Sequence, residues 1–414
     1  GCPDPMVLYY RSWVLAQAGD IAAAQTALQT AATCSPAHCF PNKLEAVLAL
    51  QTAMHLNPQD AHPPYLLGNF WSPHRRYAEA IACWERSASL EVGFPTVQRN
   101  LGLAYFNKQH DPQKALVAYE RAFALDPNDA RVFFELDQLY KKLNQPPQDR
   151  LARLEQYAHL VDQRDDLTIE QINLLNLLGR HDEAFVRLMA RSFHPWEGGE
   201  GKTTAQYVAC LVEQAKQHLA QNNPADAIDC LDRAQVYPHN LGEGKLSGAQ
   251  ENQIFYWLGC AYNLLGDAQR AKSNFVRASV GLSEPTSALY YNDQPPDMIF
   301  YQGLAQRKLG REEDAASIFH KLIDYGLAHL DDDVQIDYFA VSLPDFLVFD
   351  EDLRLHNRIH CHYMMGLGYL GLASGDGQAE ARAEEQFRAL LALRSDHLGA
   401  VSHQKMNWNT NREL

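Results

Sequence analysis

An internal repeat constrains the fold of this chain more than any other feature. A Gly or Asn is followed five residues later by Ala, four residues after that by a large apolar residue, and three residues further by a residue that is usually small or apolar. The copies are Gly19, Ala24, Leu28 and Ala31; Gly179, Ala184, Leu188 and Arg191; Asn222, Ala227, Leu231 and Ala234; Gly266, Ala271, Phe275 and Ala278; and Gly310, Ala315, Phe319 and Leu322. A repeating chain grows by stacking units, so its 414 residues need not form two or three separate globular domains.

The spacing indicates that each unit is a pair of helices joined by a tight turn. The Gly or Asn suits a turn that requires a positive φ. The Ala lets the second helix approach the first, and the apolar residue four positions later shares its face. Leu-Gly pairs mark the first helix of a unit, and Gly68 and Gly102 lie 34 residues apart. Pro58 and Pro127 stop one helix and start the next unit.

These positions and this period resemble the tetratricopeptide repeat. The resemblance implies an all-α, right-handed α-solenoid of nine to ten helical hairpins. We expect hairpins to begin near Pro5, His62, Pro95, Ala130, Asp165, Tyr207, Asn252 and Asp297, with a degenerate one near Asn42 and a last one near Asn357.

The repeat is regular in the first part of the chain and interrupted in the second. We therefore expect a regular array over residues 1–192 and a continuing array with loop insertions over residues 193–414. The four predicted insertions are 193–204, 237–250, 282–297 and 325–356. Long insertions into a solenoid are often functional.

The first two insertions share the tetrapeptide Gly-Glu-Gly-Lys, at Gly199–Lys202 and Gly242–Lys245. Two interpretations are open. Glu200 and Glu243 can accept hydrogen bonds from backbone N–H groups at the start of the next helix, with the lysines in solvent. Alternatively, insertions at equivalent positions project from one rim of the solenoid and line a shared pocket.

Under the second interpretation, the insertions supply aromatic, carboxylate, amide and ammonium side chains to a ligand site. The candidates are Trp196, Glu197, Glu200, Lys202, Asn240, Glu243, Lys245, Tyr290, Tyr291, Asn292 and Asp293. Aromatic rings beside polar acceptors suit a sugar, and they also suit a peptide. Paired carboxylates support glycoside hydrolysis only at a suitable separation, so the sequence assigns no catalytic residue. His356, His360 and His362 lack the further ligands of a metal motif, and we assign no metal and no cofactor.

Charge and composition limit the classes of partner that this chain can bind. The net charge of −15 opposes binding to nucleic acid or to anionic lipid. No run of apolar residues approaches the roughly 18–20 that a membrane span needs. The eight cysteines form no Cys-x-x-Cys motif, so we expect free thiols and a reduced, cytoplasmic location. The chain begins with Gly1 and shows no signal peptide, and we expect it to be a piece of a longer protein.

Several longer phrases carry a narrower resemblance. They are Cys39–Pro41, Arg76–Ile81, Phe94–Tyr105, Leu136–Tyr140, Phe193–Lys202 and Tyr237–Lys245. Together they resemble the C-terminal repeat region of large, mostly bacterial proteins of uncharacterised function. In that family a β-rich N-terminal domain, similar to galactose-mutarotase-like sandwiches, precedes the repeats, and the resemblance implies a link to carbohydrate metabolism.

Two functions follow as hypotheses. The first is a non-catalytic repeat scaffold that binds a protein or peptide, including the N-terminal domain that the resemblance implies. The second is a carbohydrate-binding or glycoside-processing site that the inserted loops form together with that domain. The sequence alone does not decide between them.

Overall fold

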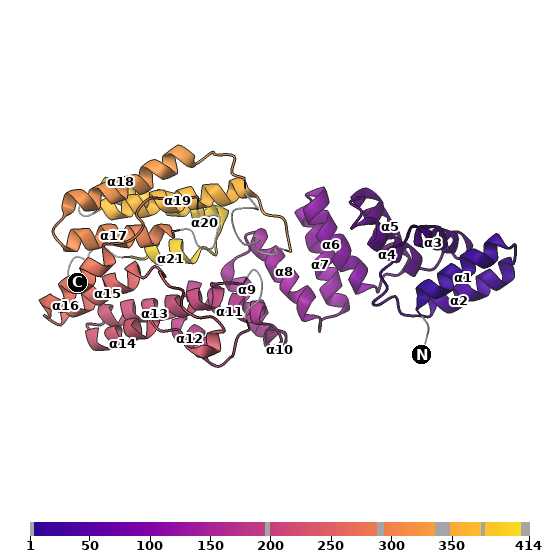
Figure 1. Ribbon diagram of the computed structural model, residues 1–414, viewed down its shortest axis with the longest axis horizontal. Coiled ribbons are helices and arrows are strands. Elements are labelled where there is room, and N and C mark those ends of the chain that lie inside the picture. Colours follow the sequence, from indigo (N-terminus) through magenta and orange to yellow (C-terminus); the bar gives the residue numbers. More distant parts are fainter. Residues whose placement is uncertain (1–3, 195–198, 288–293, 336–347, 374–376, 407–414) are drawn as a thin grey trace. The chain divides into compact units, whose positions relative to one another are not determined.

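The computed structural model describes residues 4–194, 199–287, 294–335, 348–373 and 377–406, and these form helices but no strand (Figure 1). The predicted all-α solenoid of helical hairpins is confirmed. The chain divides into two compact units: unit 1 holds residues 1–139 and 348–350, and unit 2 holds residues 140–347 and 351–414. The predicted division at residue 192 concerned the regularity of the repeat, and it stays a prediction.

Unit 1 is a stack of short helices. Its helices are α1 (Pro5–Gln17), α2 (Ile21–Ala32), α3 (Leu44–Leu56), α4 (His62–Trp71), α5 (Tyr77–Leu90), α6 (Pro95–Gln109), α7 (Pro112–Leu125) and most of α8 (Ala130–Lys142). Helices α1 and α2, α4 and α5, and α6 and α7 pack as hairpins, whereas α3 packs singly between α1 and α4. The degenerate hairpin predicted near Asn42 is therefore one helix, because its turn residues are missing.

Unit 2 holds the remaining helices. They are α9 (Pro147–Gln156), α10 (Ala158–Val161), α11 (Asp165–Leu177), α12 (His181–Met189), α13 (Lys202–Ala220), α14 (Pro224–Ala234), η1 (His239–Leu241), α15 (Asn252–Leu264), α16 (Ala268–Ala278), α17 (Pro296–Lys308), α18 (Glu312–His329), α19 (Leu353–Leu372), α20 (Gly377–Leu393) and α21 (Leu398–Gln404). Five hairpins follow one another, from α11–α12 to α19–α20.

The repeat positions have the predicted roles. Gly19, Gly179, Gly266, Gly310 and Asn222 all adopt a positive φ, between 59° and 84°. The alanines five residues later are buried, and so are the large apolar residues that follow them. Asp N-caps and prolines in the first turn set several helix starts, as at Asp111 and Pro112.

A glycine of the first helix allows close contact with a ring of the second helix. A Cβ at Gly102 would lie 2.5 Å from the Tyr119 ring, and one at Gly259 would lie 2.5 Å from the Phe275 ring. The Leu-Gly signature therefore marks the place where the two helices of a hairpin come closest.

The helix bounds shorten the longest predicted insertion. Helix α18 continues through His329 and α19 begins at Leu353, so the link between them covers residues 330–352 rather than 325–356. Helices α18 and α19 pack against each other as a hairpin of long helices, with 18 and 20 residues.

The prediction of free cysteines is wrong at Cys34, which is disulfide-bonded. The other six cysteines that the structure describes are free. The prediction relied on apolar helical neighbours, and Cys34 lies beyond the end of α2 at Ala32, where no helical face determines its environment.

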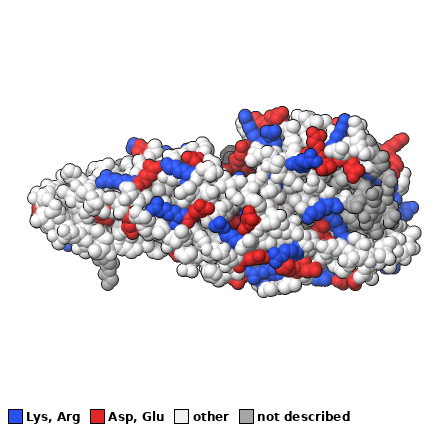
Figure 2. Space-filling view, turned by 180° about the vertical axis from the view of Figure 1, so that it is seen from behind, with Lys and Arg blue, Asp and Glu red and all other residues white. Residues whose placement is uncertain are grey.

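Surface charge differs along the chain. In Figure 2 acidic and basic side chains are interspersed over most of the visible face, while the end that carries α1–α3 is almost uncharged. Exposed apolar side chains gather on these helices, including Val14, Leu44 and Leu48. Among the described helices, none is both long enough and apolar enough to cross a bilayer.

Candidate functional site

The structure brings the first two insertions together. The backbone N–H of Phe193 donates to the carbonyl of Asn240 over 2.7 Å. The Asn240 amide donates to the carbonyls of Leu188 and Arg191, over 3.1 and 3.0 Å. The side-chain amide of Asn240 therefore satisfies backbone carbonyl groups at and just beyond the end of α12.

Glu243 has a similar structural role at the start of α13. Its two carboxylate oxygens accept from the backbone N–H of Gly201, over 3.0 and 3.1 Å. Thr204 also donates to it, over 3.4 Å. Glu243 thus caps a helix, as the first of the two interpretations proposed. The capped helix, α13, precedes Glu243 in the sequence instead of following it.

The remaining predicted site residues divide into two groups. Glu200 and Lys202 are exposed, and Lys245 pairs with Glu251 and donates to the Gln235 carbonyl. Trp196, Glu197, Tyr290, Tyr291, Asn292 and Asp293 lie outside the described residues. Since the aromatic part of the predicted site falls there, the proposed ligand site in the insertions stays a prediction.

A different site lies on the surface that the first helices of unit 2 share. We call the surface formed by α11, α13, α15, α17 and α19 the first-helix face. Helix α21, the last helix among the described residues, lies between α11–α15 and α17–α20 in Figure 1. Residues of all five first helices contact it or line a pocket with it.

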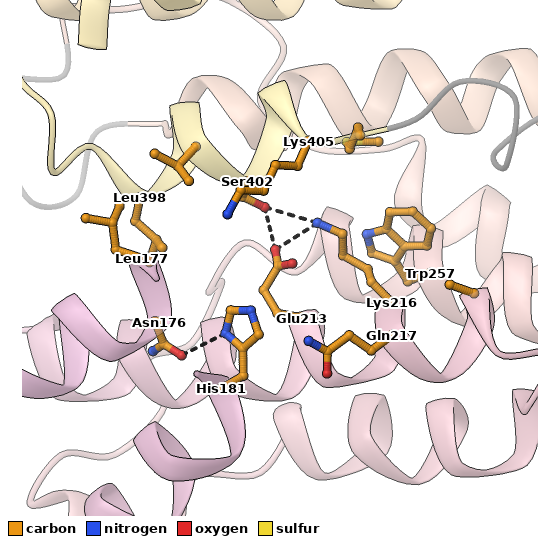
Figure 3. A pocket seen from close by; sticks show the side chains of 13 residues that line it. Asn176, Leu177, His181, Glu213, Lys216, Gln217, Trp257, Leu398, Ser402 and Lys405 are labelled. Atoms are coloured by element: carbon orange, nitrogen blue, oxygen red, sulfur yellow. Dashed lines mark hydrogen bonds and ion pairs between the residues drawn. The ribbon is translucent and has the colours of Figure 1, made fainter. Parts of the chain in front are cut away.

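A pocket of about 250 Å³ remains beside α21 (Figure 3). Its lining comes from α11, α12, α13, α15, α21 and the two residues after α21. The lining residues are Asn176, Leu177, His181, Glu213, Lys216, Gln217, Ala220, Trp257, Leu398, Val401, Ser402, Lys405 and Met406. A volume of this size holds one large side chain or a small molecule.

Three polar side chains point toward one another in this pocket (Figure 3). Lys216 donates to Glu213 over 2.8 Å and to the Ser402 hydroxyl over 3.0 Å, and Ser402 in turn donates to Glu213. Burial raises the pKa of Glu213, but the Lys216 ammonium and the hydrogen bonds more than offset it, so the pKa lies below its ordinary value. Ser402 of α21 is therefore joined by two hydrogen bonds to an ion pair that lies within α13.

Amides and an imidazole line the opposite wall of the pocket. His181 Nδ1 lies 3.1 Å from Asn176 Oδ1, and the Cys210 thiol donates to the same oxygen over 3.2 Å. Burial lowers the pKa of His181, so the ring is neutral at pH 7. Trp257 supplies an apolar wall that is only 2% exposed.

His403 fixes the other side of α21 against aromatic rings. Its ring centroid lies 5.4 Å from that of Phe300 and 5.7 Å from that of Tyr301. Its Nδ1 lies 2.7 Å from the Gly399 carbonyl and 3.2 Å from the Tyr363 hydroxyl, and its Nε2 is buried without a partner. Burial lowers the pKa of His403 to about 4, so the neutral ring packs as part of the core.

A buried ion network positions the turn before α21. Arg150 donates to Asp396 over 3.0 Å and to Glu170 over 2.6 Å, and its side chain is 1% exposed. Lys141 adds a bond of 2.9 Å to Glu170. Burial raises the pKa of Asp396, but Lys141, Arg394 and Arg150 hold it well below its ordinary value.

This arrangement is suited to binding. Glu213 is paired with Lys216, His181 is bonded to Asn176, and the walls are largely apolar. Among the residues that the structure describes, no group of three His, Cys, Asp or Glu side chains is placed to hold a metal ion. A protein side chain with an apolar body suits the pocket better than a group that requires proton transfer.

The sequence analysis missed this site for a physical reason. Helix α21 has seven residues and no apolar period, and Asp396 meets Arg150 from 246 positions away. The sequence carries only an indirect signal for this site. First helices of stacked hairpins form a common surface, so an apolar first-helix face predicts that another segment packs on it.

Comparisons with known proteins agree with the repeat. The sequence profile of the tetratricopeptide repeat matches residues 297–325, which lie in the hairpin α17–α18.

Three solved structures are similar. One is YrrB, described as a TPR protein with an unusual peptide-binding site, at 20% identity, with 45% of this chain and 90% of that chain covered and a TM-score of 0.34. A tetratricopeptide repeat protein from Parabacteroides merdae is 14% identical over 73% of this chain and 98% of that chain, with a TM-score of 0.31. The human IFIT1 dimer with PPP-AAAA is 14% identical over 97% and 81%, with a TM-score of 0.32. At these scores we draw nothing about function from the three structures, and residues 297–325 alone are assigned to the repeat.

Proposed function

We propose that this chain is a non-catalytic helical-repeat scaffold and that the first-helix face of unit 2 binds a protein partner. One observation carries the proposal: five successive first helices converge on α21 and leave a pocket of about 250 Å³ beside it. A surface that already holds a helix of its own chain has the shape and polarity that a helical partner requires.

The chemistry of the pocket selects the partner's side chain. Trp257, Leu177 and Leu398 offer apolar contact, while Gln217 and Lys405 stand among the lining side chains with polar groups. A partner that inserts one large apolar side chain, with acceptors beside it for Lys405, fits this lining. Helix α21 then forms one wall of the site.

Peptide selection against the full chain tests the proposal. Peptides selected from a displayed library would be measured for affinity to the wild type and to two variants that each place a Trp at an exposed position of α13. Ala220→Trp fills the pocket, whereas Ala205→Trp, on the same helix, lies away from it. We expect at least a tenfold loss for Ala220→Trp and none for Ala205→Trp; equal affinity for all three chains would contradict the proposal.

We also propose that this chain is part of a larger bacterial protein, which the sequence resemblance alone supports. The β-rich N-terminal domain of that protein is then one proposed partner of the scaffold.

A further inference from the structure

A three-residue segment far along the sequence belongs to unit 1. Residues 348–350 are grouped with residues 1–139, although more than two hundred residues separate them in the chain. The segment is Val348-Phe349-Asp350, it is not helical, and it lies against the hairpin α6–α7.

One side chain binds the backbone of this segment at two points. Asn107, on α6, donates from Nδ2 to the Val348 carbonyl over 3.0 Å. The backbone N–H of Asp350 donates to Asn107 Oδ1 over 2.8 Å. Asn107 therefore binds the backbone on both sides of one central residue, in a segment that bends at Val348 and Phe349.

That central residue enters an aromatic pocket. Phe349 is 1% exposed, and its ring centroid lies 4.7 Å from that of Phe106 and 5.6 Å from that of Tyr119, both in edge geometry. Such pairs favour an aromatic ring over an aliphatic side chain of similar size.

The pocket is built by unit 1 without help from the segment. The Tyr119 hydroxyl donates to Glu135 over 3.1 Å, and Arg99 holds that carboxylate with two bonds of 2.7 and 2.6 Å. Gly102 leaves the space that the Tyr119 ring fills. A ring that is fixed from behind is ready for a ligand, which lowers the ordering cost of binding.

The residue after the Phe faces a cation. Lys108 lies 3.2 Å from the Asp350 carboxylate, which is 60% exposed, and Lys108 also lies 5.1 Å from the Tyr77 ring centroid. An exposed pair of this kind adds little affinity, but it favours an acidic residue over a basic one at this position.

We propose that hairpin α6–α7 is a docking site for a non-helical segment of a partner protein that carries Phe followed by Asp or Glu, and that residues 348–350 occupy the site within the chain. The partner competes with this internal segment. Asn107 binds the backbone on both sides of the Phe, the Phe106–Tyr119 pocket selects the ring, and Lys108 selects the acidic residue.

The test uses the full chain, with a substitution that weakens the binding of residues 348–350 to hairpin α6–α7. The probe is a fluorescein-labelled peptide with the sequence Leu-Val-Phe-Asp-Glu-Asp, and its binding is measured by fluorescence polarisation. We expect saturable binding to Phe349→Ala, at least tenfold weaker binding to the wild type, and a loss of at least tenfold when Asn107→Ala is added. Gln109→Ala, an exposed change on the same helix, serves as the matched control and leaves the affinity unchanged.

A second variant keeps the test decisive if Phe349→Ala does not fold. Asp350→Pro removes the N–H that donates to Asn107 and leaves Phe349 in place, so it weakens the internal segment by a different route. Circular dichroism establishes which variants fold. Peptide binding that is equal in the wild type and the opened variants, or that survives Asn107→Ala, overturns the proposal, as does equal binding of a probe with Ala in place of Phe.

Discussion

The two units each hold a later segment of their own chain, and they do so by different means. Unit 1 holds the non-helical segment 348–350 through the side-chain amide of Asn107, which bonds a carbonyl and an N–H. Unit 2 holds the helix α21 through side chains alone, chiefly Ser402 with Glu213 and Lys216, and His403 with aromatic rings.

The difference follows from where the backbone N–H and C=O groups of each segment find hydrogen-bond partners. A helix bonds its own N–H and C=O groups, so a surface that receives it needs shape and side-chain contacts. A non-helical segment brings unpaired backbone groups, and burying them costs free energy unless the receiving surface pairs them. Asn107 pairs two such groups, the Val348 carbonyl and the Asp350 N–H.

The supporting ion pairs differ as well. In unit 1 Arg99 and Glu135 join nearby repeats, α6 and α8, behind the Tyr119 ring. In unit 2 Arg150 joins α9 to Asp396, at the far end of the chain. Loss of the first pair affects a pocket wall, whereas loss of the second affects the placement of a whole helix.

The largest expected effect comes from Arg150→Ala. Removing this guanidinium leaves the Asp396 and Glu170 carboxylates buried with fewer partners, which costs about 3–5 kcal/mol. We expect the free energy of unfolding of unit 2 to fall by this amount in chemical denaturation, and hydrogen exchange in α21 to accelerate.

Arg131→Ala is the matched control. Arg131 is 64% exposed where it meets Glu135, so we expect a loss of at most about 1 kcal/mol. If both arginines cost the same, the buried network does not anchor α21.

Acid should destabilise the packing of α21. The pKa of His403 is lowered to about 4 from its ordinary 6.5, so below pH 6.5 the unfolded chain binds a proton that the folded chain does not. The stability of the folded state is therefore complete above pH 6.5 and declines as the pH falls toward 4, by on the order of 3 kcal/mol. His397, whose pKa is lowered to about 3, acts in the same direction.

Denaturant unfolding at pH 7, 5.5 and 4 measures this loss, and His403→Phe isolates it. The variant keeps an aromatic ring between Phe300 and Tyr363 but cannot be protonated. We expect its stability to depend less on pH than that of the wild type; an identical pH dependence would show that His403 is not the titrating group.

A smaller effect is expected for Glu243. Glu243→Ala removes the acceptor for Gly201 at the start of α13, and lost helix caps cost roughly 1 kcal/mol. Thermal unfolding measures the cost, with Glu200→Ala, an exposed neighbour in the same motif, as the control that changes nothing. Equal losses would contradict the cap, and a change in sugar binding without a change in stability would favour the predicted saccharide site.

The smallest effect is expected for Lys108→Met. This change removes the exposed ion pair with Asp350 and is worth at most about 1 kcal/mol. We expect exchange of the Asp350 N–H to accelerate slightly at low salt and not at high salt. A large effect that is independent of salt would mean that Lys108 contributes packing as well as charge.

The sequence predicted the parts of the fold that depend on local spacing. The positive φ at Gly266, the buried Ala271 and the buried Phe275 all follow from the repeat, and the first residues of α4 and α6 fall where they were expected. Periodicity is a local signal, and it needs no knowledge of distant residues.

The contacts of both internal segments were not predictable in this way. Nothing in the neighbourhood of Phe349 indicates a partner at Phe106, and nothing around Ser402 indicates Glu213. The repeated Gly-Glu-Gly-Lys motif drew attention to the insertions, yet Glu243 caps a helix that lies earlier in the chain. A repeated carboxylate is used for structure as readily as for binding, and sequence spacing does not distinguish the two uses.

Hydrogen exchange resolved to single residues tests the central claim most directly. The chain would be measured as wild type, as Asn107→Ala and as Gly399→Val, in which the added side chain meets the Tyr363 hydroxyl. The account predicts a slow Asp350 N–H in the wild type that becomes fast in Asn107→Ala, with α21 unchanged, and faster exchange in α21 in Gly399→Val, with Asp350 unchanged. An Asp350 N–H that is unprotected in the wild type, or a loss of protection at both segments in either variant, would contradict it.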